Sequence, residues 1–184
     1  MKTWIALFRG INVGGNKMLP MKQLTALLEK AGCRDVKTYI QSGNAVFRNP
    51  MSDASRMAAR IRAAVSAGHG FEPRVLMLDR NELQRAISAN PFPQATADPK
   101  SLHLFFLAEK PKSPDIEALN GIKARGEAFA LEDKIFYLYT PEGFGTSKLA
   151  ERAERYLGVD ATARNWRTVT AVLELAKRSS DVTP

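Results

Sequence analysis

The order in which strand and helix patterns alternate is the strongest constraint on the fold of this chain. In the first half, strand patterns lie at 4–8, 36–41, 45–48 and 74–78, and helical patterns at 20–32, 54–67 and 80–88. The second half repeats the order, with strand patterns at 102–107, 128–131, 135–139 and 161–164 and helical patterns near 115–124, 148–157 and 166–177. Each half therefore reads strand-helix-strand-strand-helix-strand, followed by one more helix.

This order is that of the split βαβ, or ferredoxin-like, plait. We therefore predict an α+β protein with two ferredoxin-like lobes, each an antiparallel sheet with helices packed on it. The segment N-P-F-P-Q-A-T-A-D-P-K at 90–100 has three prolines and no periodicity, so we place the boundary there and expect lobes at 1–92 and 93–184. Residue identity between the halves is limited to an Arg-Asn pair at the start of each last helix, Arg80-Asn81 and Arg164-Asn165.

All of the excess positive charge lies in the first half. Residues 1–92 contain 14 Lys or Arg and 6 Asp or Glu, whereas residues 93–184 contain 13 of each, so the net charge of +8 belongs to the first lobe. Such a polarised charge can concentrate an anionic partner, whether nucleic acid, nucleotide or acidic protein. A solvated basic surface is an equally good interpretation.

The apolar runs and the cysteine content indicate a cytoplasmic location. The N-terminal run W-I-A-L-F is too short for a signal peptide, and no later run could span a bilayer, so no membrane partner is expected. The single cysteine, Cys33, excludes an intrachain disulfide and fits a reducing compartment. Cys33, His69 and His103 lack the spacing of metal ligands, so we expect no metal and no cofactor.

A glycine-rich segment, R-G-I-N-V-G-G-N-K at 9–17, follows the first strand. It has the glycine spacing of a P-loop, but Asn16 takes the lysine position and Met18 follows Lys17, so the register fails. Its glycines still permit backbone N–H groups to converge on an anion beside the two cations. The predicted ligand-binding residues are Arg9, Asn12, Gly14, Gly15 and Lys17. The alternative is a loop that needs glycine only for positive φ.

A second glycine-rich segment, T-P-E-G-F-G-T-S-K-L, leads into a predicted helix at 148. There Ser147 could cap the helix and Lys148 could meet an anion, so both are secondary binding candidates. Simple capping after a flexible loop is the preferred interpretation.

The positions of these loops depend on the sheet topology. Taking the first and third strands of a plait as parallel neighbours, we expect R-G-I-N-V-G-G-N-K to share one end of its sheet with N-P-M-S-D at 49–53. In the second lobe, A-E-K-P-K-S-P-D at 108–115 should likewise share an end with the second glycine segment. The hairpin turn S-G-N at 42–44 and the Arg-Asn pairs should lie at the opposite ends.

Aromatic residues suggest an RNA-recognition plait, in which exposed aromatics of the sheet stack on bases. The second lobe carries five on its predicted strands at 102–107 and 135–139, but they fall on both faces of the sheet. Burial against the other lobe or a partner is therefore the preferred interpretation. The five are Phe105, Phe106, Phe136, Tyr137 and Tyr139.

Five motifs, in this order, resemble a bacterial domain-of-unknown-function family catalogued as number 1697. They are R-G-I-N-V-G-G-N, T-Y-I-Q-S-G-N, N-P-F, P-E-G-F-G-T-S-K-L and A-T-A-R-N-W-R-T-V, and the resemblance runs from about residue 4 to residue 175. It implies two ferredoxin-like lobes, in agreement with the duplicated order of elements. It implies no activity, cofactor or catalytic residue.

Three functional hypotheses follow. The leading one is a small anionic ligand, a nucleotide or phosphorylated metabolite, bound at the glycine-rich loops. The second is a nucleic-acid-binding module that uses the basic first lobe, including Arg56 and Arg60 on one helix face. The third is a protein-interaction scaffold. No feature of the sequence assigns a reaction.

Overall fold

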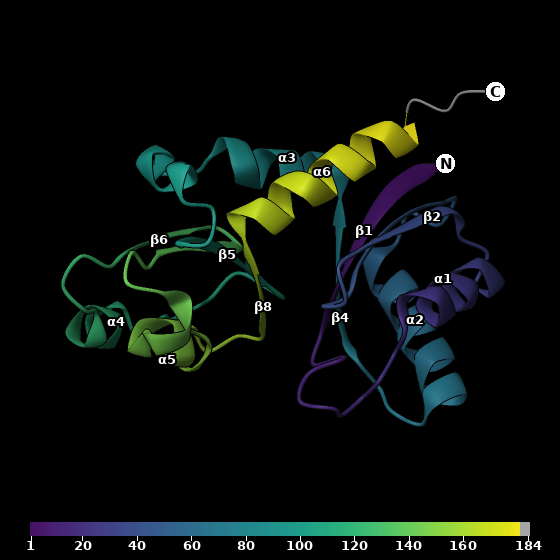
Figure 1. The fold of residues 1–184 in the computed structure, drawn as a ribbon, viewed down its shortest axis with the longest axis horizontal. Coiled ribbons are helices and arrows are strands. Elements are labelled where there is room, and N and C mark those ends of the chain that lie inside the picture. Colours follow the sequence, from purple (N-terminus) through teal and green to yellow (C-terminus); the bar gives the residue numbers. More distant parts are fainter. Residues whose placement is uncertain (181–184) are drawn as a thin grey trace. The chain divides into compact units, whose positions relative to one another are not determined.

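The computed structural model describes residues 1–180 and contains two compact units. One consists of Met1–Arg85 together with residues from Thr170 onward, and the other of Ala86–Val169. Each unit contains one four-stranded antiparallel sheet, and six α-helices accompany the two sheets (Figure 1). The predicted α+β class and the duplicated order of elements are therefore confirmed.

The first sheet has the strand order β2-β3-β1-β4. Its strands are β1 (Lys2–Arg9), β2 (Arg34–Tyr39), β3 (Asn44–Asn49) and β4 (Arg74–Asp79). Helices α1 (Met21–Lys30) and α2 (Ala54–His69) connect them, and α3 (Arg80–Ser88) follows β4. Asp53 accepts a hydrogen bond from the backbone N–H of Arg56 and so caps α2, whose other end lies at Gly70 with φ 72°.

The second sheet has the equivalent order, β6-β7-β5-β8. Its strands are β5 (Leu102–Leu107), β6 (Ala128–Glu132), β7 (Ile135–Tyr139) and β8 (Ala161–Asn165). Helices α4 (Ile116–Ile122) and α5 (Lys148–Leu157) accompany it, with short 3-10 turns at Pro93–Ala97 and Phe144–Thr146, and α6 (Trp166–Ser180) follows β8.

Each sheet has a helix-covered face with its own hydrophobic core. Helices α1 and α2 lie on one face of the first sheet, and α4 and α5 lie on one face of the second (Figure 1). Alternate residues of β1 (Trp4, Ala6 and Phe8) join the first core, because side chains of a strand alternate between its faces. Phe105 and Leu107 of β5 have the equivalent place in the second core.

The expectation of parallel central strands is wrong. β1 pairs with β3 in antiparallel register, with Leu7 opposite Asn44, and β5 pairs with β7 in the same way. The end of β1 therefore lies beside the start of β3, since neighbouring antiparallel strands run in opposite directions. The glycine segment consequently shares its end of the sheet with the β2–β3 turn at 40–43 and not with N-P-M-S-D. By the same reasoning, residues 108–115 and the second glycine segment lie at opposite ends of the second sheet.

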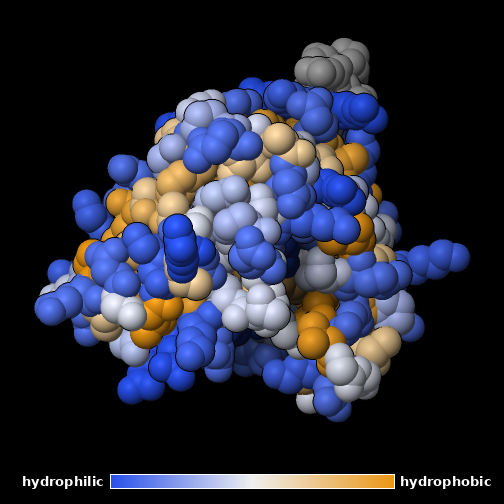
Figure 2. Space-filling view, turned by 60° about the vertical axis from the view of Figure 1, so that its left-hand side comes forward, coloured by the Kyte–Doolittle hydropathy of each residue, from blue (hydrophilic) through white to orange (hydrophobic). Residues whose placement is uncertain are grey.

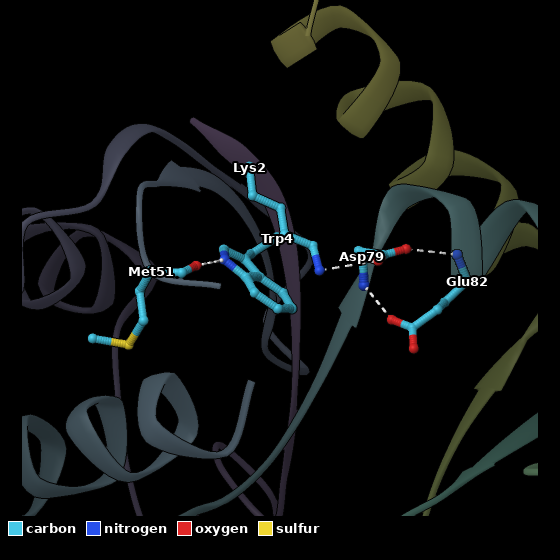
Figure 3. A network of polar contacts seen from close by, with 5 residues as sticks. All are labelled: Lys2, Trp4, Met51, Asp79 and Glu82. Atoms are coloured by element: carbon cyan, nitrogen blue, oxygen red, sulfur yellow. Dashed lines mark hydrogen bonds and ion pairs between the residues drawn. The ribbon is translucent and has the colours of Figure 1, made fainter. Parts of the chain in front are cut away.

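The last helix of each half is capped by the residue that ends the fourth strand. The Asp79 carboxylate accepts from the Glu82 N–H at 2.8 Å while Glu82 accepts from the Asp79 N–H at 2.7 Å, which is a capping box for α3 (Figure 3). At α6, Asn165 accepts from the Thr168 N–H at 2.9 Å. Asp79 and Asn165 are thus equivalent, so the two Arg-Asn pairs are out of register and their identity carries no structural meaning.

The start of β1 is attached to this capping box. The Lys2 ammonium lies 3.1 Å from the Asp79 carboxylate and 4.0 Å from the centre of the Trp4 ring. The Trp4 indole N–H donates to the Met51 carbonyl at 2.9 Å (Figure 3). These contacts join β1, β4, α3 and the β3–α2 loop at the end of the sheet opposite the glycine segment.

None of the helices in residues 1–180 has the length and apolar character needed to cross a membrane.

Candidate functional site

Three segments meet at one end of the first sheet, which we call the glycine end: the β1–α1 loop (9–20), the β2–β3 turn (40–43) and the approach to β4 (71–74). The Phe8 N–H donates to the Gly43 carbonyl at 2.8 Å, which joins β1 to the turn. Arg9 and Arg74 are opposite each other in the β1–β4 ladder. The antiparallel topology therefore brings the glycine loop together with a turn that the sequence analysis had placed elsewhere.

Asn12 holds the loop in shape. Its amide nitrogen donates to the carbonyls of Leu19 at 2.9 Å and Gln41 at 2.8 Å, and its amide oxygen accepts from the Leu19 N–H at 2.7 Å. Its φ of 54° is in the left-handed region, which asparagine tolerates better than most residues. The side chain that we predicted to bind a ligand is therefore occupied in fixing the loop.

The tip of the loop is a tight turn. Val13 and Asn16 form an isolated antiparallel bridge, and the Asn16 N–H donates to the Val13 carbonyl at 3.2 Å. Gly14 and Gly15, at φ 59° and 76°, occupy the two central positions, where positive φ favours glycine. A Cβ atom added at either glycine would meet no atom within 4 Å, so the tip projects into open space.

Gly43 is required for a different reason. Its φ is 80°, and an added Cβ would lie 2.7 Å from Cβ of Phe8 and 2.6 Å from Cδ1 of Ile11. The motif S-G-N thus marks the place where the hairpin turn packs directly against the end of β1. This role is structural.

The glycine end is basic. Its three cations are Arg9, Lys17 and Arg74, and the segments 9–20, 40–43 and 71–74 contain a single acidic residue, Glu72. The Glu72 carboxylate lies 3.0 Å from Nε of Arg62 on α2. Lys17 is exposed and has φ 49°, and its carbonyl accepts from the Asn12 N–H at 3.2 Å.

Apolar side chains are also exposed there. Val13 is 66% exposed, Met18 56% and Ile40 51%. None of the three was predicted from the sequence as a site residue, although V-G-G-N-K-M places Val13 and Met18 beside a glycine turn. Ile40 could not be associated with the loop without the antiparallel pairing of β1 and β3. The view in Figure 2 shows hydrophobic residues, in orange, at the surface among hydrophilic residues, in blue.

The second glycine segment packs against the second sheet through Phe144, which contacts the rings of His103 and Phe105. Ser147 is buried, and its hydroxyl accepts from the Ala150 N–H at 3.0 Å as the cap of α5, while Lys148 is exposed in the first turn. Phe144 stacks on the His103 imidazole with 3.8 Å between ring centres. Burial lowers the pKa of His103 to about 4, so the imidazole is neutral at neutral pH. Capping explains Ser147 without a ligand.

The thiol of Cys33 is buried and unsuited to catalysis. Burial raises its pKa to about 11, although the Asn49 amide, 3.8 Å from Sγ, opposes this effect. Asn49 also donates to the Gly32 carbonyl at 3.0 Å and accepts from the Met51 N–H at 2.9 Å, so it belongs to the core. Within the described part of the chain, no group of three or more His, Cys, Asp or Glu residues could hold a metal ion.

The aromatic residues of the second sheet do not form an exposed platform. Of the five on β5 and β7, four side chains are buried and Tyr139 is half-buried. The Tyr137 hydroxyl donates to the Ala86 carbonyl at 2.7 Å, and burial raises its pKa to about 12. The buried four are Phe105, Phe106, Phe136 and Tyr137.

Comparison with known proteins places the chain beside others of unknown function. The sequence pattern of a family described as proteins of unknown function, number 1697, matches residues 1–137. Three of the five motifs noted above lie in this range, and the last two lie beyond it. No curated protein matches the chain significantly in sequence. A conserved bacterial protein from Streptococcus pneumoniae has a similar structure, with a TM-score of 0.72, 19% identity, and coverage of 95% of this chain and 98% of that one. At this identity the likeness concerns the fold alone.

Proposed function

Since the chain belongs to the family of unknown function 1697, its function has to be argued from its own residues, and we propose that the first unit binds an anionic group at the glycine end. The glycine-rich pattern of residues 9–17 favours a nucleotide or phosphorylated metabolite as the ligand. The candidate residues are Arg9, Lys17 and Arg74, with Gly14 and Gly15 shaping the loop. Arg74 joins this set through the strand register.

The observation that carries the proposal is the cross-strand pairing of Arg9 with Arg74. Residues directly opposite each other in a ladder have their side chains on the same face of the sheet, so one anion can contact both guanidinium groups. Guanidinium groups bind phosphate and carboxylate with two parallel hydrogen bonds. Lys17, on the loop that leaves the same strand, adds a third cation at the same end of the sheet.

Thermal denaturation tests the proposal. We expect inorganic phosphate, nucleotides or sugar phosphates at 100 times their dissociation constant to stabilise the protein by about 2.7 kcal/mol. The double substitution Lys17→Gln with Arg74→Gln should abolish this shift. Lys112→Gln, at an exposed lysine of the second unit, is the matched control and should leave it unchanged. Absence of a shift across the whole panel, at low ionic strength, would contradict small-ligand binding.

Exposed arginines on α2 favour nucleic acid as the second candidate. Arg56 and Arg60 are exposed and four residues apart, so they lie on one face of the helix. Binding through them should weaken steeply with salt and decrease when both are replaced by glutamine. Burial of the aromatic residues weighs against base stacking, so such binding would depend on phosphate contacts. An oligonucleotide titration at two salt concentrations distinguishes this candidate from the first.

A further inference from the structure

We infer that the glycine end docks an acidic segment of a partner protein, with Val13, Met18 and Ile40 as its apolar contact surface. This inference rests on the proposed function, because the same three cations would pair with the carboxylates of the partner. It goes further by naming the class of partner and by assigning a role to the apolar residues.

The apolar residues are concentrated at this place. Among the described residues, five large hydrophobic side chains are strongly exposed, and three of them are at the glycine end. Single exposed apolar residues are ordinary on protein surfaces, whereas a group of them inside a polar rim is typical of an interaction site. The polar neighbour here is basic, because Lys17 lies between Val13 and Met18 in the sequence of the loop.

The loop that presents these residues is firmly attached to the sheet. Ile11 and Leu19, near its two ends, are 1% and 0% exposed, and both belong to the core. Asn12 makes three hydrogen bonds that join the loop to itself and to the turn containing Ile40. Exposure of the apolar groups is therefore a property of the folded loop. A preorganised surface of this kind binds a partner at low entropic cost.

The shape of the loop favours a macromolecule over a small ligand. Small-molecule sites are recesses that bury most of the ligand surface. Gly14 and Gly15 face open space, so the tip projects outward and encloses nothing. A partner would have to supply the opposing surface.

The chemistry of the surface favours an acidic protein. Aliphatic side chains offer no stacking platform for bases, which nucleic-acid sites usually provide with aromatic groups. A second copy of the same end would bring like charges together, which is unfavourable. Arg9 and Arg74, opposite each other on neighbouring strands, present guanidinium groups whose planar geometry matches carboxylates.

Selection from a random dodecapeptide library on the whole chain tests this inference. The selected peptides should be richer in Asp and Glu than the library and should contain apolar residues next to the acidic ones. Synthetic copies are then titrated by fluorescence anisotropy. The apolar variant combines Val13→Thr, Met18→Gln and Ile40→Asn, with asparagine chosen because Ile40 has φ 49°. We expect it to bind at least tenfold more weakly.

Two further variants separate the possible results. Lys17→Gln with Arg74→Gln should also weaken peptide binding at least tenfold, whereas Ile116→Gln, at a residue of the second unit that is 38% exposed, should not change it. If the cation variant loses binding and the apolar variant does not, anion binding stands and the docking inference is overturned. If no acidic peptides are selected and the cation variant behaves as the parent protein, both are overturned.

Other classes of macromolecule are tested with the same variants. Phosphatidylserine vesicles and a single-stranded oligonucleotide are titrated beside the peptides. Binding of either that depends on Val13, Met18 and Ile40, in the absence of peptide binding, would overturn a protein as the occupant. Unchanged melting temperatures of the variants show that any loss is not due to unfolding.

Discussion

The loops that follow the first strand of each sheet, β1 and β5, lie at equivalent ends of the two sheets but differ in composition. In both units the end of the first strand bonds to the turn before the third: Phe8 N–H to Gly43 at 2.8 Å, and Leu107 N–H to Lys134 at 2.9 Å. In the second unit, however, the loop at 108–115 contains two prolines and no glycine. Its Lys110 lies 3.7 Å from Asp133 in the neighbouring turn. The first unit has glycines, cations and exposed apolar groups at this place.

This difference shows that the fold does not require the glycine loop. The second unit makes its turn with Asp133 at φ 50°, and its two segments, 108–115 and 132–134, contain four acidic and three basic residues. The features particular to the first unit therefore exceed what the connection needs. Departures from the simplest local solution are expected where a protein binds something.

A second equivalence concerns Trp4 and His103. Trp4 is opposite Asp79 and His103 is opposite Asn165, and these two partners cap the last helices of the two halves. The Trp4 indole has a hydrogen-bond acceptor in Met51. Nδ1 of His103 is buried without a hydrogen-bond partner, and the imidazole is covered by Phe144. The second glycine segment thus performs the covering that the short β3–α2 loop performs in the first unit.

The largest expected effect is on the free energy of unfolding, and it distinguishes Gly43 from the glycines of the loop tip, Gly14 and Gly15. Gly43→Ala should lower the free energy of unfolding by about 3 kcal/mol or more, because its Cβ overlaps Phe8 and Ile11 in addition to the strain of positive φ. Gly14→Ala has only the strain and should cost about 1 kcal/mol. Urea denaturation measures both. Equal costs would show that the turn moves away from β1 and that the close packing is not required.

Acidification should lower the free energy of unfolding through His103 in the second unit. The pKa of His103 is lowered from 6.5 to about 4 by burial. Below pH 6.5 the unfolded chain therefore binds a proton that the folded protein does not, and stability falls as the pH decreases toward 4. The total loss from this group is about 3 kcal/mol. In His103→Leu this part of the pH dependence should disappear, as measured by urea denaturation between pH 4 and 7. An unchanged slope would assign the effect to other groups.

The next prediction is that the side chain of Asn12 stabilises the conformation of the glycine loop. Asn12→Ala removes three hydrogen bonds, and we expect a loss of about 1–2 kcal/mol together with faster hydrogen exchange at Leu19. Asn16→Ala is the matched control in the same loop, because the Asn16 amide makes one exposed contact, 3.5 Å from the Gly14 carbonyl. If both variants behave alike, Asn12 does not fix the loop.

The smallest effect is expected for the ion pair of the second unit. The side chains of Lys110 and Asp133 are 71% and 72% exposed, so Lys110→Ala should change the free energy of unfolding by less than about 0.5 kcal/mol. A larger loss, measured by urea denaturation at low salt, would mean that the pair stabilises the second-unit loop in the way that Asn12 stabilises the first.

The elements and their order were predictable from the sequence, but the relative direction of the first and third strands of each sheet was assigned incorrectly. Periodicity identified the eight strands and the six α-helices of the described residues, and β5, β7, α3 and α5 have the predicted bounds. The hydrophobic patterns of these short strands did not decide whether neighbouring strands are parallel. The error moved the turn at Gly43 to the wrong end of the sheet and so separated Ile40 from the glycine loop. The ligand-binding role stays a prediction for all seven residues selected from the sequence: Arg9, Asn12, Gly14, Gly15, Lys17, Ser147 and Lys148.

The roles of polar side chains depended on contacts that only the fold provides. Ser147 was predictable as a cap because Ser and Thr are the usual residues before a helix. The hydrogen bond from Asn12 to Gln41 spans 29 residues of the sequence and has no local signal. The capping box of Asp79 and Glu82 does have one, the spacing D-x-x-E, which the comparison of Arg-Asn pairs obscured.

The division of the chain also sets the order in which the two units become available during synthesis. The first unit is discontinuous, because it includes residues from Thr170 onward, whereas the second is one uninterrupted segment, Ala86–Val169. A ribosome releases residues in sequence order, so the complete second unit emerges before the last part of the first. The basic unit, although it begins the chain, is the later of the two to have all of its residues outside the ribosome.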